Sequence, residues 1–300
     1  MSGLMRISGH TPLWIAARAL LAGRVDDFFD RWRRAAETFD PEDIHDLRVS
    51  SRRLREGFLL FAAAYRPESV RRAARGVRKV TRLLGALRNT DEALVFFRRM
   101  AETAAGSAGR HLARIIARHE DLRREQRRQL RRGLRELDPR RTREALARIV
   151  ASPALFSPPP SGIDPFTTIA AFAADRLRER LDHVLALVPD ACREADVEAQ
   201  HRLRIAVKHY RYRLEILSFL PGDAFAALHA AIKAYQDVLG TMHDLDVFAG
   251  IVRHEGLPSA DECVILTHIA GERHRQFALF AGLLAETPFE AIGEQVRRAL

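Results

Sequence analysis

The chain has 300 residues, of which 47% are hydrophobic, so it is long enough for one large domain or two ordinary ones with a real core. It carries 49 Lys and Arg against 39 Asp and Glu, and the formal net charge of +10 favours an anionic partner. No stretch approaches the roughly 18 uncharged apolar residues of a membrane helix, and the two cysteines, without CxxC spacing, provide neither a disulfide framework nor a zinc site. Arg18 and Arg24 interrupt the N-terminal apolar run, unlike a secretory signal, so we expect a cytoplasmic protein.

The first half is predicted to be helical throughout, because apolar residues recur with helical period and no segment alternates as a strand does. Asp40 and Pro41 are typical of a helix start, and Asn89 to Asp91 resemble the start of a further helix. The expected helices cover residues 11–37, 40–65, a third segment ending near 87, a fourth beginning at 89–91, then 110–137 and 139–151.

A run rich in proline and serine at residues 152–163 is the clearest break in the chain, and we interpret it as a linker. It separates a first helical bundle repeat, 1–151, from a second, 164–300. Pro189 is expected to break the first helix of the second half. The helices expected there cover residues 164–187, 196–220, 223–240, 244–254, 258–286 and 288–300.

The two halves contain the same basic motif. His45-Asp46-Leu47-Arg48-Val49 recurs as His201-Arg202-Leu203-Arg204-Ile205, 156 residues later. The apolar residues of the next helix also align between the halves. A pattern preserved over two helices and a turn predicts an all-α fold of two similar helical bundles packed together.

Basic residues in each copy fall at i, i+3, i+7 and i+10, which places them in one stripe roughly 80° wide on a helix. The two stripes consist of His45, Arg48, Arg52 and Arg55, and of His201, Arg204, Lys208 and Arg211. A charge run on a helix is usually a solvated face, but apolar residues flank both stripes. The face with Arg53, His209 and Arg213 is interpreted as the wet one. The stripes are therefore predicted to line a groove, where unpaired cations favour a bound polyanion.

A second basic ridge lies on the following helix of the first half, at Arg71, Arg75, Arg78 and Arg82. The second half keeps only Lys233 there and adds Asp237, while Glu215 is placed to neutralise Arg211. Binding is therefore expected to be stronger on the first half.

The two motifs, each followed by a Leu-Gly motif, resemble the CHAD family, the "conserved histidine α-helical domain". The second motif is Leu84-Gly85-x-x-Arg88-Asn89-x-Asp91 and Leu239-Gly240-x-x-His243-Asp244-x-Asp246. The resemblance covers nearly the whole chain. It implies two pseudo-symmetric four-helix-bundle repeats around a central basic groove or pore, which binds inorganic polyphosphate at polyphosphate granules. It adds Arg88 and His243 to the expected binding residues. From the residues themselves we expect no cofactor, no metal site and no catalytic residue.

Three alternatives remain open at this point. His45-Asp46 and His243-Asp244 are similar to the pairs of HD-type metal phosphohydrolases, although no further metal-binding His and Asp can be placed. Sequence-independent nucleic-acid binding would use the same basic surface, but few aromatic residues are placed to stack on bases. A scaffold that docks granule proteins is compatible with polyphosphate binding. Asp91 and Asp246 either orient nearby basic residues or cap a helix.

Overall fold

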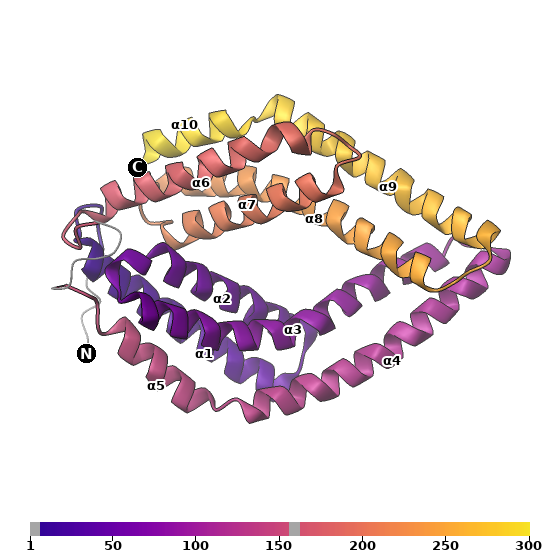
Figure 1. Cartoon of the computed structure of the whole chain (residues 1–300), viewed down its shortest axis with the longest axis horizontal. Coiled ribbons are helices and arrows are strands. Elements are labelled where there is room, and N and C mark those ends of the chain that lie inside the picture. The colour runs from indigo at the N-terminus through magenta and orange to yellow at the C-terminus, as the bar shows by residue number, and fades with distance from the viewer. Residues whose placement is uncertain (1–6, 156–162) are drawn as a thin grey trace.

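The computed structural model describes residues 7–155 and 163–300, and its fold is all-α, as expected (Figure 1). Within those ranges there are ten α-helices, two short 3-10 turns and no β-strand. Most of the expected linker, residues 156–162, lies outside the described part. In the described ranges, no helix has both the length and the apolar character needed to cross a bilayer.

Each half contains five α-helices in the described residues, one more than a four-helix bundle has. The first half consists of α1 (Leu13–Thr38), α2 (Pro41–Leu60), the turn η1 (Ala62–Ala64), α3 (Pro67–Ala101), α4 (Gly106–Glu136) and α5 (Pro139–Val150). The second consists of α6 (Ile169–Ala191), α7 (Val197–Ile216), the turn η2 (Gly222–Ala224), α8 (Phe225–His254), α9 (Ser259–Glu286) and α10 (Phe289–Ala299).

Local capping explains where the two motif helices begin. The Asp40 carboxylate accepts a hydrogen bond from the backbone N–H of Glu42 at 2.8 Å, and Pro41 occupies the first position of α2. At the start of α7, Asp196 accepts from the N–H of Ala199 at 2.9 Å. The same kind of cap therefore sets the start of both motif helices.

Three expected helix boundaries were wrong. α3 continues through Asn89 and Asp91, and α8 continues through Met242 to Asp244, where the sequence predicted breaks. Pro189 lies inside the last turns of α6, which runs to Ala191. Apolar residues with helical period continue beyond the expected breaks, and their burial in tertiary contacts overrides the local start signals.

The packing order is the same in the two halves. Helix α2 packs between α1 and α3, and α7 packs between α6 and α8, while α5 lies against α1 and α10 against α6. The halves contact each other through α2 with α7, α4 with α9, α1 with α6 and α3 with α8. Figure 1 shows the helices of the two halves lying opposite each other, with the halves meeting at both ends.

Two apolar clusters hold this arrangement together. The larger contains the fully buried rings of Phe28, Phe58 and Tyr210 and extends through both halves. A smaller cluster joins α3, α4, α8 and α9, and in it the rings of Phe96 and Phe248 stack with centroids 4.6 Å apart. Burial of these side chains supplies the main driving force that closes both ends of the molecule.

The helix face interpreted as wet is instead the junction between the halves. Glu56 of α2, with 1% of its surface exposed, accepts hydrogen bonds from Arg213 Nε at 2.8 Å and His209 Nδ1 at 2.6 Å on α7. Arg53 Nε donates to the buried Glu215 carboxylate at 2.6 Å. A buried ion pair between two helices has the same sequence pattern as a solvated charge, which explains the wrong interpretation.

Candidate functional site

A cavity of about 280 Å³ lies between the two halves, and we call it the inter-half cavity. Helices α2, α3, α7 and α8 all contribute to its lining. Six of the expected site residues line it, namely His45, Arg48, Arg52, Arg88, Arg204 and His243. The lining is completed by Val49, Asn89, Glu92, Asp244, Val247 and Phe248.

The cations of the two stripes come together here without counter-ions. Within the described residues, Arg48, Arg52, Arg55, Arg204 and Lys208 make no ion pair. Burial, followed by repulsion from Arg52, lowers the pKa of Arg48 to about 10. Burial and four neighbouring arginines of both stripes lower the pKa of Lys208 to about 8. The unliganded site therefore carries an excess of positive charge, in which cations of the two stripes repel each other.

Gly85 of the Leu-Gly motif makes room for one of these cations. A Cβ atom at position 85 would lie 3.0 Å from Nη1 of Arg48. The guanidinium of α2 is thus packed directly on the backbone of α3. At Gly240, the corresponding position of α8, nothing lies within 4 Å, so this close approach belongs to the first half alone.

Two buried nitrogen atoms of the site lack protein partners. Neither Nδ1 of His45 nor Nε of Arg204 has a hydrogen-bond partner in the part of the chain that the structure describes. Burial and Arg88 lower the pKa of His45, and burial, Arg204 and His201 lower that of His243 to about 4. Nε of Arg204 can only donate, and an unsatisfied guanidinium donor fits a ligand that brings hydrogen-bond acceptors and negative charge.

Two carboxylates also face this cavity, and we did not predict them as site residues. Glu92 lies 2.9 Å from Nε of Arg88, an i, i+4 ion pair that the spacing alone indicates. Asp244 occupies the position that Asn89 holds in the first half. Burial and Glu92 raise the pKa of Asp244 to about 6, so the two carboxylates are close enough to repel each other.

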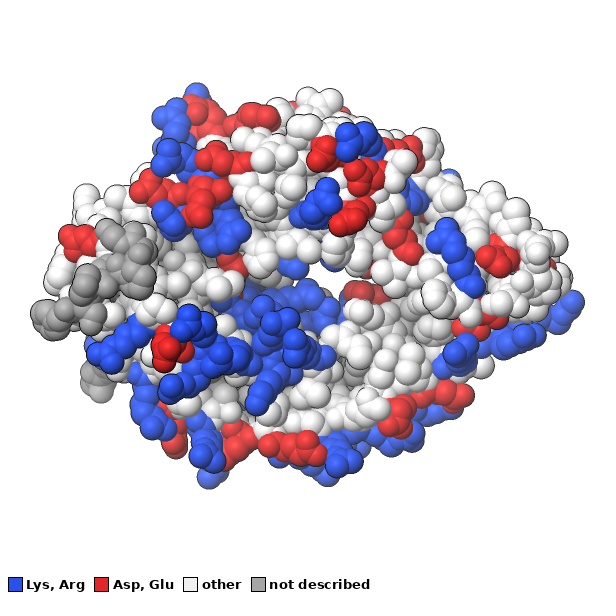
Figure 2. Space-filling model, in the orientation of Figure 1, with Lys and Arg blue, Asp and Glu red and all other residues white. Residues whose placement is uncertain are grey.

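The first-half ridge continues the positive surface outward from the cavity. Burial and then Arg78, Arg52 and Arg82 lower the pKa of Arg55, so the end of the stripe lies near the α3 ridge. Arg75, Arg78 and Arg82 are all exposed. Figure 2 shows Lys and Arg side chains gathered beside the hollow at the centre of the molecule. A continuous basic surface thus runs from solvent to the cavity.

Two expected site residues of the second half are neutralised by neighbouring carboxylates. Arg211 is buried and donates to the Glu215 carboxylate at 2.8 Å and to the side chain of Gln236 at 2.6 Å. Lys233 is exposed and ion-paired with Asp237. Both pairings agree with the acidic departures noted in the sequence and leave the second half with fewer free cations.

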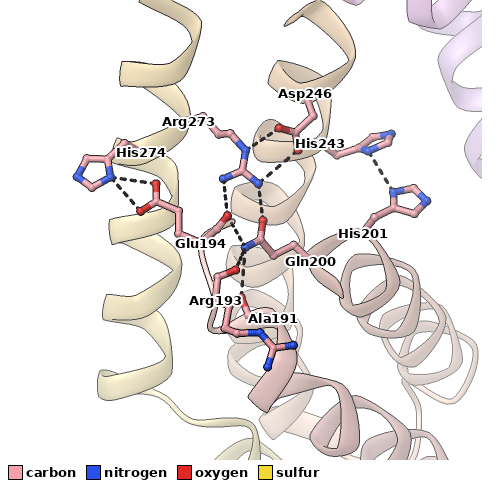
Figure 3. Close-up of polar contacts among 9 residues, drawn as sticks. All are labelled: Ala191, Arg193, Glu194, Gln200, His201, His243, Asp246, Arg273 and His274. Atoms are coloured by element: carbon pink, nitrogen blue, oxygen red, sulfur yellow. Dashed lines mark hydrogen bonds and ion pairs between the residues drawn. The ribbon is translucent and has the colours of Figure 1, made fainter. Parts of the chain in front are cut away.

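Figure 3 shows how Arg273 of α9 contacts residues next to the two second-half histidines in α7 and α8. Nδ1 of His201 lies 3.1 Å from Nδ1 of His243. Arg273 of α9 donates to Asp246 at 2.6 Å and also to the side chain of Gln200, the residue before His201. Arg273 is therefore a positioning residue. We did not predict it from the sequence, where the one signal was Asp246 of the Leu-Gly motif, which was expected to orient a basic residue or cap a helix.

The first half uses the same device. Arg123 of α4 donates to Asp91 of α3 at 2.5 Å. Asp91 and Asp246 both lie inside long helices, so neither caps a helix, and each ties its helix to the next one.

The HD pairs are not arranged as a metal centre in the described residues. Asp46 is ion-paired with Arg31 of α1 rather than with His45. In the described ranges, no group of three or more His, Cys, Asp or Glu side chains is placed to hold a metal ion.

Comparisons with known proteins agree with this architecture. The sequence matches the CHAD domain family over residues 19–253. The crystal structure of the CHAD domain from the plant Ricinus communis is similar, with a TM-score of 0.66 and 22% identity, over 100% of this chain and 96% of that chain. PptA from Streptomyces chartreusis has a TM-score of 0.67 and 16% identity, over 92% of this chain and 100% of that chain. A search of curated proteins finds no match. At these identities the structural likeness shows the fold alone.

Proposed function

Because this chain belongs to the CHAD domain family, we propose that it binds inorganic polyphosphate in the inter-half cavity. The observation that carries the proposal is the convergence of unpaired cations from both stripes on one cavity. A chain of phosphates supplies closely spaced negative charges, and guanidinium groups bind phosphate oxygens with two parallel hydrogen bonds. The exposed arginines of the α3 ridge extend this surface for a longer chain.

We propose further that binding is non-catalytic and that the protein associates with polyphosphate granules, where granule proteins are possible partners. The positive groups here hold phosphate oxygens, and the proposal requires no cofactor. Nucleic acid is expected to bind only weakly and without specificity, because a nucleoside separates each pair of its backbone phosphates. The cavity of about 280 Å³ suits consecutive phosphates better.

The proposal is tested by comparing long-chain polyphosphate with single-stranded DNA at equal phosphate concentration. Polyphosphate should bind more tightly at 50 mM and at 200 mM salt. If about four phosphates are neutralised, its affinity should fall roughly 50- to 150-fold between these concentrations. Isothermal titration calorimetry measures the affinity for each of the two polymers. Equal affinities for the two polymers, or no loss of polyphosphate affinity with salt, would contradict a cavity that selects consecutive phosphates by charge.

The non-catalytic part of the proposal has a separate test. Incubation with long-chain polyphosphate and Mg²⁺ or Mn²⁺ should release no orthophosphate above a protein-free blank, measured colorimetrically. Protein-dependent release that is lost in His45→Ala and in His243→Ala would instead support a phosphohydrolase.

The contribution of Lys208 to polyphosphate binding should depend on pH. The pKa of Lys208, about 8 in the free protein, should rise on binding, because the polyanion attracts the ammonium group that the neighbouring arginines repel. Binding then takes up a proton above pH 8, so affinity should fall as pH rises from 7 to 9.5, by up to about tenfold per unit. In Lys208→Arg the guanidinium stays charged, and this part of the pH dependence should disappear. Identical calorimetric pH profiles for the two proteins would contradict the assignment.

A further inference from the structure

A second, larger cavity adjoins the inter-half cavity. It has a volume of about 590 Å³ and lies between α3, α8 and α9, and we call it the α3–α8–α9 cavity. The two cavities share the lining residues Arg88, Glu92, Asp244 and Phe248. Glu92 and Asp244 therefore lie at the junction of the two cavities.

The chemistry of the second cavity differs from that of the first. Its apolar lining includes Val95, with 68% of its surface exposed, and the stacked rings of Phe96 and Phe248. Its charged lining is predominantly acidic, with four carboxylates against two guanidinium groups, namely Glu92, Glu102, Asp244, Glu272, Arg88 and Arg99. A polyphosphate chain would be repelled there, so the region suited to phosphates ends at the junction.

The junction and the polar rim suit hydroxyl and amine donors. Ionised carboxylates are hydrogen-bond acceptors only, and a carboxylate that accepts from ribose hydroxyls is a common arrangement in nucleotide sites. Beyond the junction, Thr241 and Gln276 offer hydrogen-bonding groups beside the apolar lining. A cavity of this size that combines apolar and aromatic walls with polar groups is compatible with a small-molecule site.

We propose that the two cavities together bind a nucleoside polyphosphate such as ATP. The phosphates occupy the inter-half cavity beside Arg48, Arg52 and Arg204, the ribose lies at Glu92 and Asp244, and the base lies in the α3–α8–α9 cavity. The proposal shares the phosphate site with polyphosphate binding but names a second ligand, and it accounts for carboxylates inside a cationic site.

The test compares ATP, tripolyphosphate and adenosine by calorimetry at one ionic strength and without divalent metal. A site that recognises phosphate charge alone binds tripolyphosphate at least as tightly as ATP. Contacts with the base and ribose should make ATP bind at least about fivefold more tightly than tripolyphosphate. ATP should also compete with long-chain polyphosphate, since the phosphate site is common to both.

Two exposed valines provide matched variants. Val95→Glu places a charged side chain in the base region and should reduce ATP affinity to that of tripolyphosphate. Val264→Glu, at a 60% exposed position of α9 that lines neither cavity, adds the same charge and should leave ATP affinity unchanged. In Asp244→Ala, the preference for ATP over its 2′,3′-dideoxy analogue should be lost.

The outcomes separate this inference from polyphosphate binding. If polyphosphate binds but tripolyphosphate equals or exceeds ATP, or if the two valine variants behave alike, the nucleotide inference is wrong and the proposed function stands. If ATP binds with the stated dependence on Val95 while long-chain polyphosphate does not bind, the nucleotide inference stands and the proposed function is wrong.

Discussion

Replacing Arg48 and Arg52 together by alanine should weaken polyphosphate binding by about a hundredfold or more. Both side chains line the inter-half cavity and have no counter-ion in the described residues. A hydrogen bond to a charged group contributes about 1.5–3 kcal/mol, and two such contacts correspond to roughly a hundredfold or more in Kd. Calorimetric titration with a polyphosphate of defined length measures the loss.

Folding should survive this double substitution. The two guanidinium groups repel each other in the unliganded protein, and repulsion from Arg52 contributes to the lowered pKa of Arg48. Removing them should leave the free energy of unfolding unchanged or slightly raised, as measured by urea denaturation. A loss of helicity in the variant would mean that weaker binding reports unfolding, and the single variants Arg48→Lys and Arg52→Lys would then be compared.

The matched control must remove the same charge elsewhere. Arg53, which the sequence places on a solvated face, is unsuitable because it pairs with buried Glu215. Arg127 is unsuitable because it donates to the carbonyl of Phe39. Arg132 and Arg148 are 84% and 77% exposed and pair only with glutamates one turn away. Arg132→Ala plus Arg148→Ala should change the affinity no more than a few-fold through the overall field. Equal losses from both double variants would show that binding follows total charge.

Glu56→Ala should destabilise the protein by about 3–5 kcal/mol, because it leaves the Arg213 guanidinium buried without its counter-ion. Glu56 joins α2 of one half to α7 of the other, so the variant should loosen the contact that holds the two stripes together. Urea unfolding at pH 7 measures the effect. The exposed Glu136, paired with Arg132 within α4, provides the control, and Glu136→Ala should change stability by less than about 0.5 kcal/mol.

The same substitution has a predictable pH dependence. Burial opposes ionisation of Glu56, but hydrogen bonds from His209 and Arg213 outweigh it and lower the pKa of the carboxyl below its ordinary value of 4.5. A depressed pKa stabilises the folded state above the ordinary value, and that stabilisation disappears as pH falls through the lowered pKa. The stability difference between the wild-type protein and Glu56→Ala should therefore shrink below pH 4.5. A difference that stays constant into acid would contradict the ion pair as its source.

The helical fold and the stripes were predictable because both depend on short-range patterns. The period of the apolar residues indicates helices, and the caps at Asp40 and Asp196 mark where α2 and α7 begin. The i, i+3, i+7 spacing places Arg48 and Arg52 on one face without reference to any other helix. The neutralisation of Arg211 by Glu215 was also predictable, since those residues are one turn apart.

By itself, then, the sequence determined which residues form helices, which of them share a face, and that two similar sets occur in one chain. The tertiary structure alone decided which helix covers each face. It buried Glu56 and Arg213 between the halves, extended α3 through Asn89, and placed Glu92 and Asp244 where two cavities meet. The physical reason is that a periodic pattern reports the direction of a side chain, whereas burial and ion pairing depend on groups that lie far away in the chain.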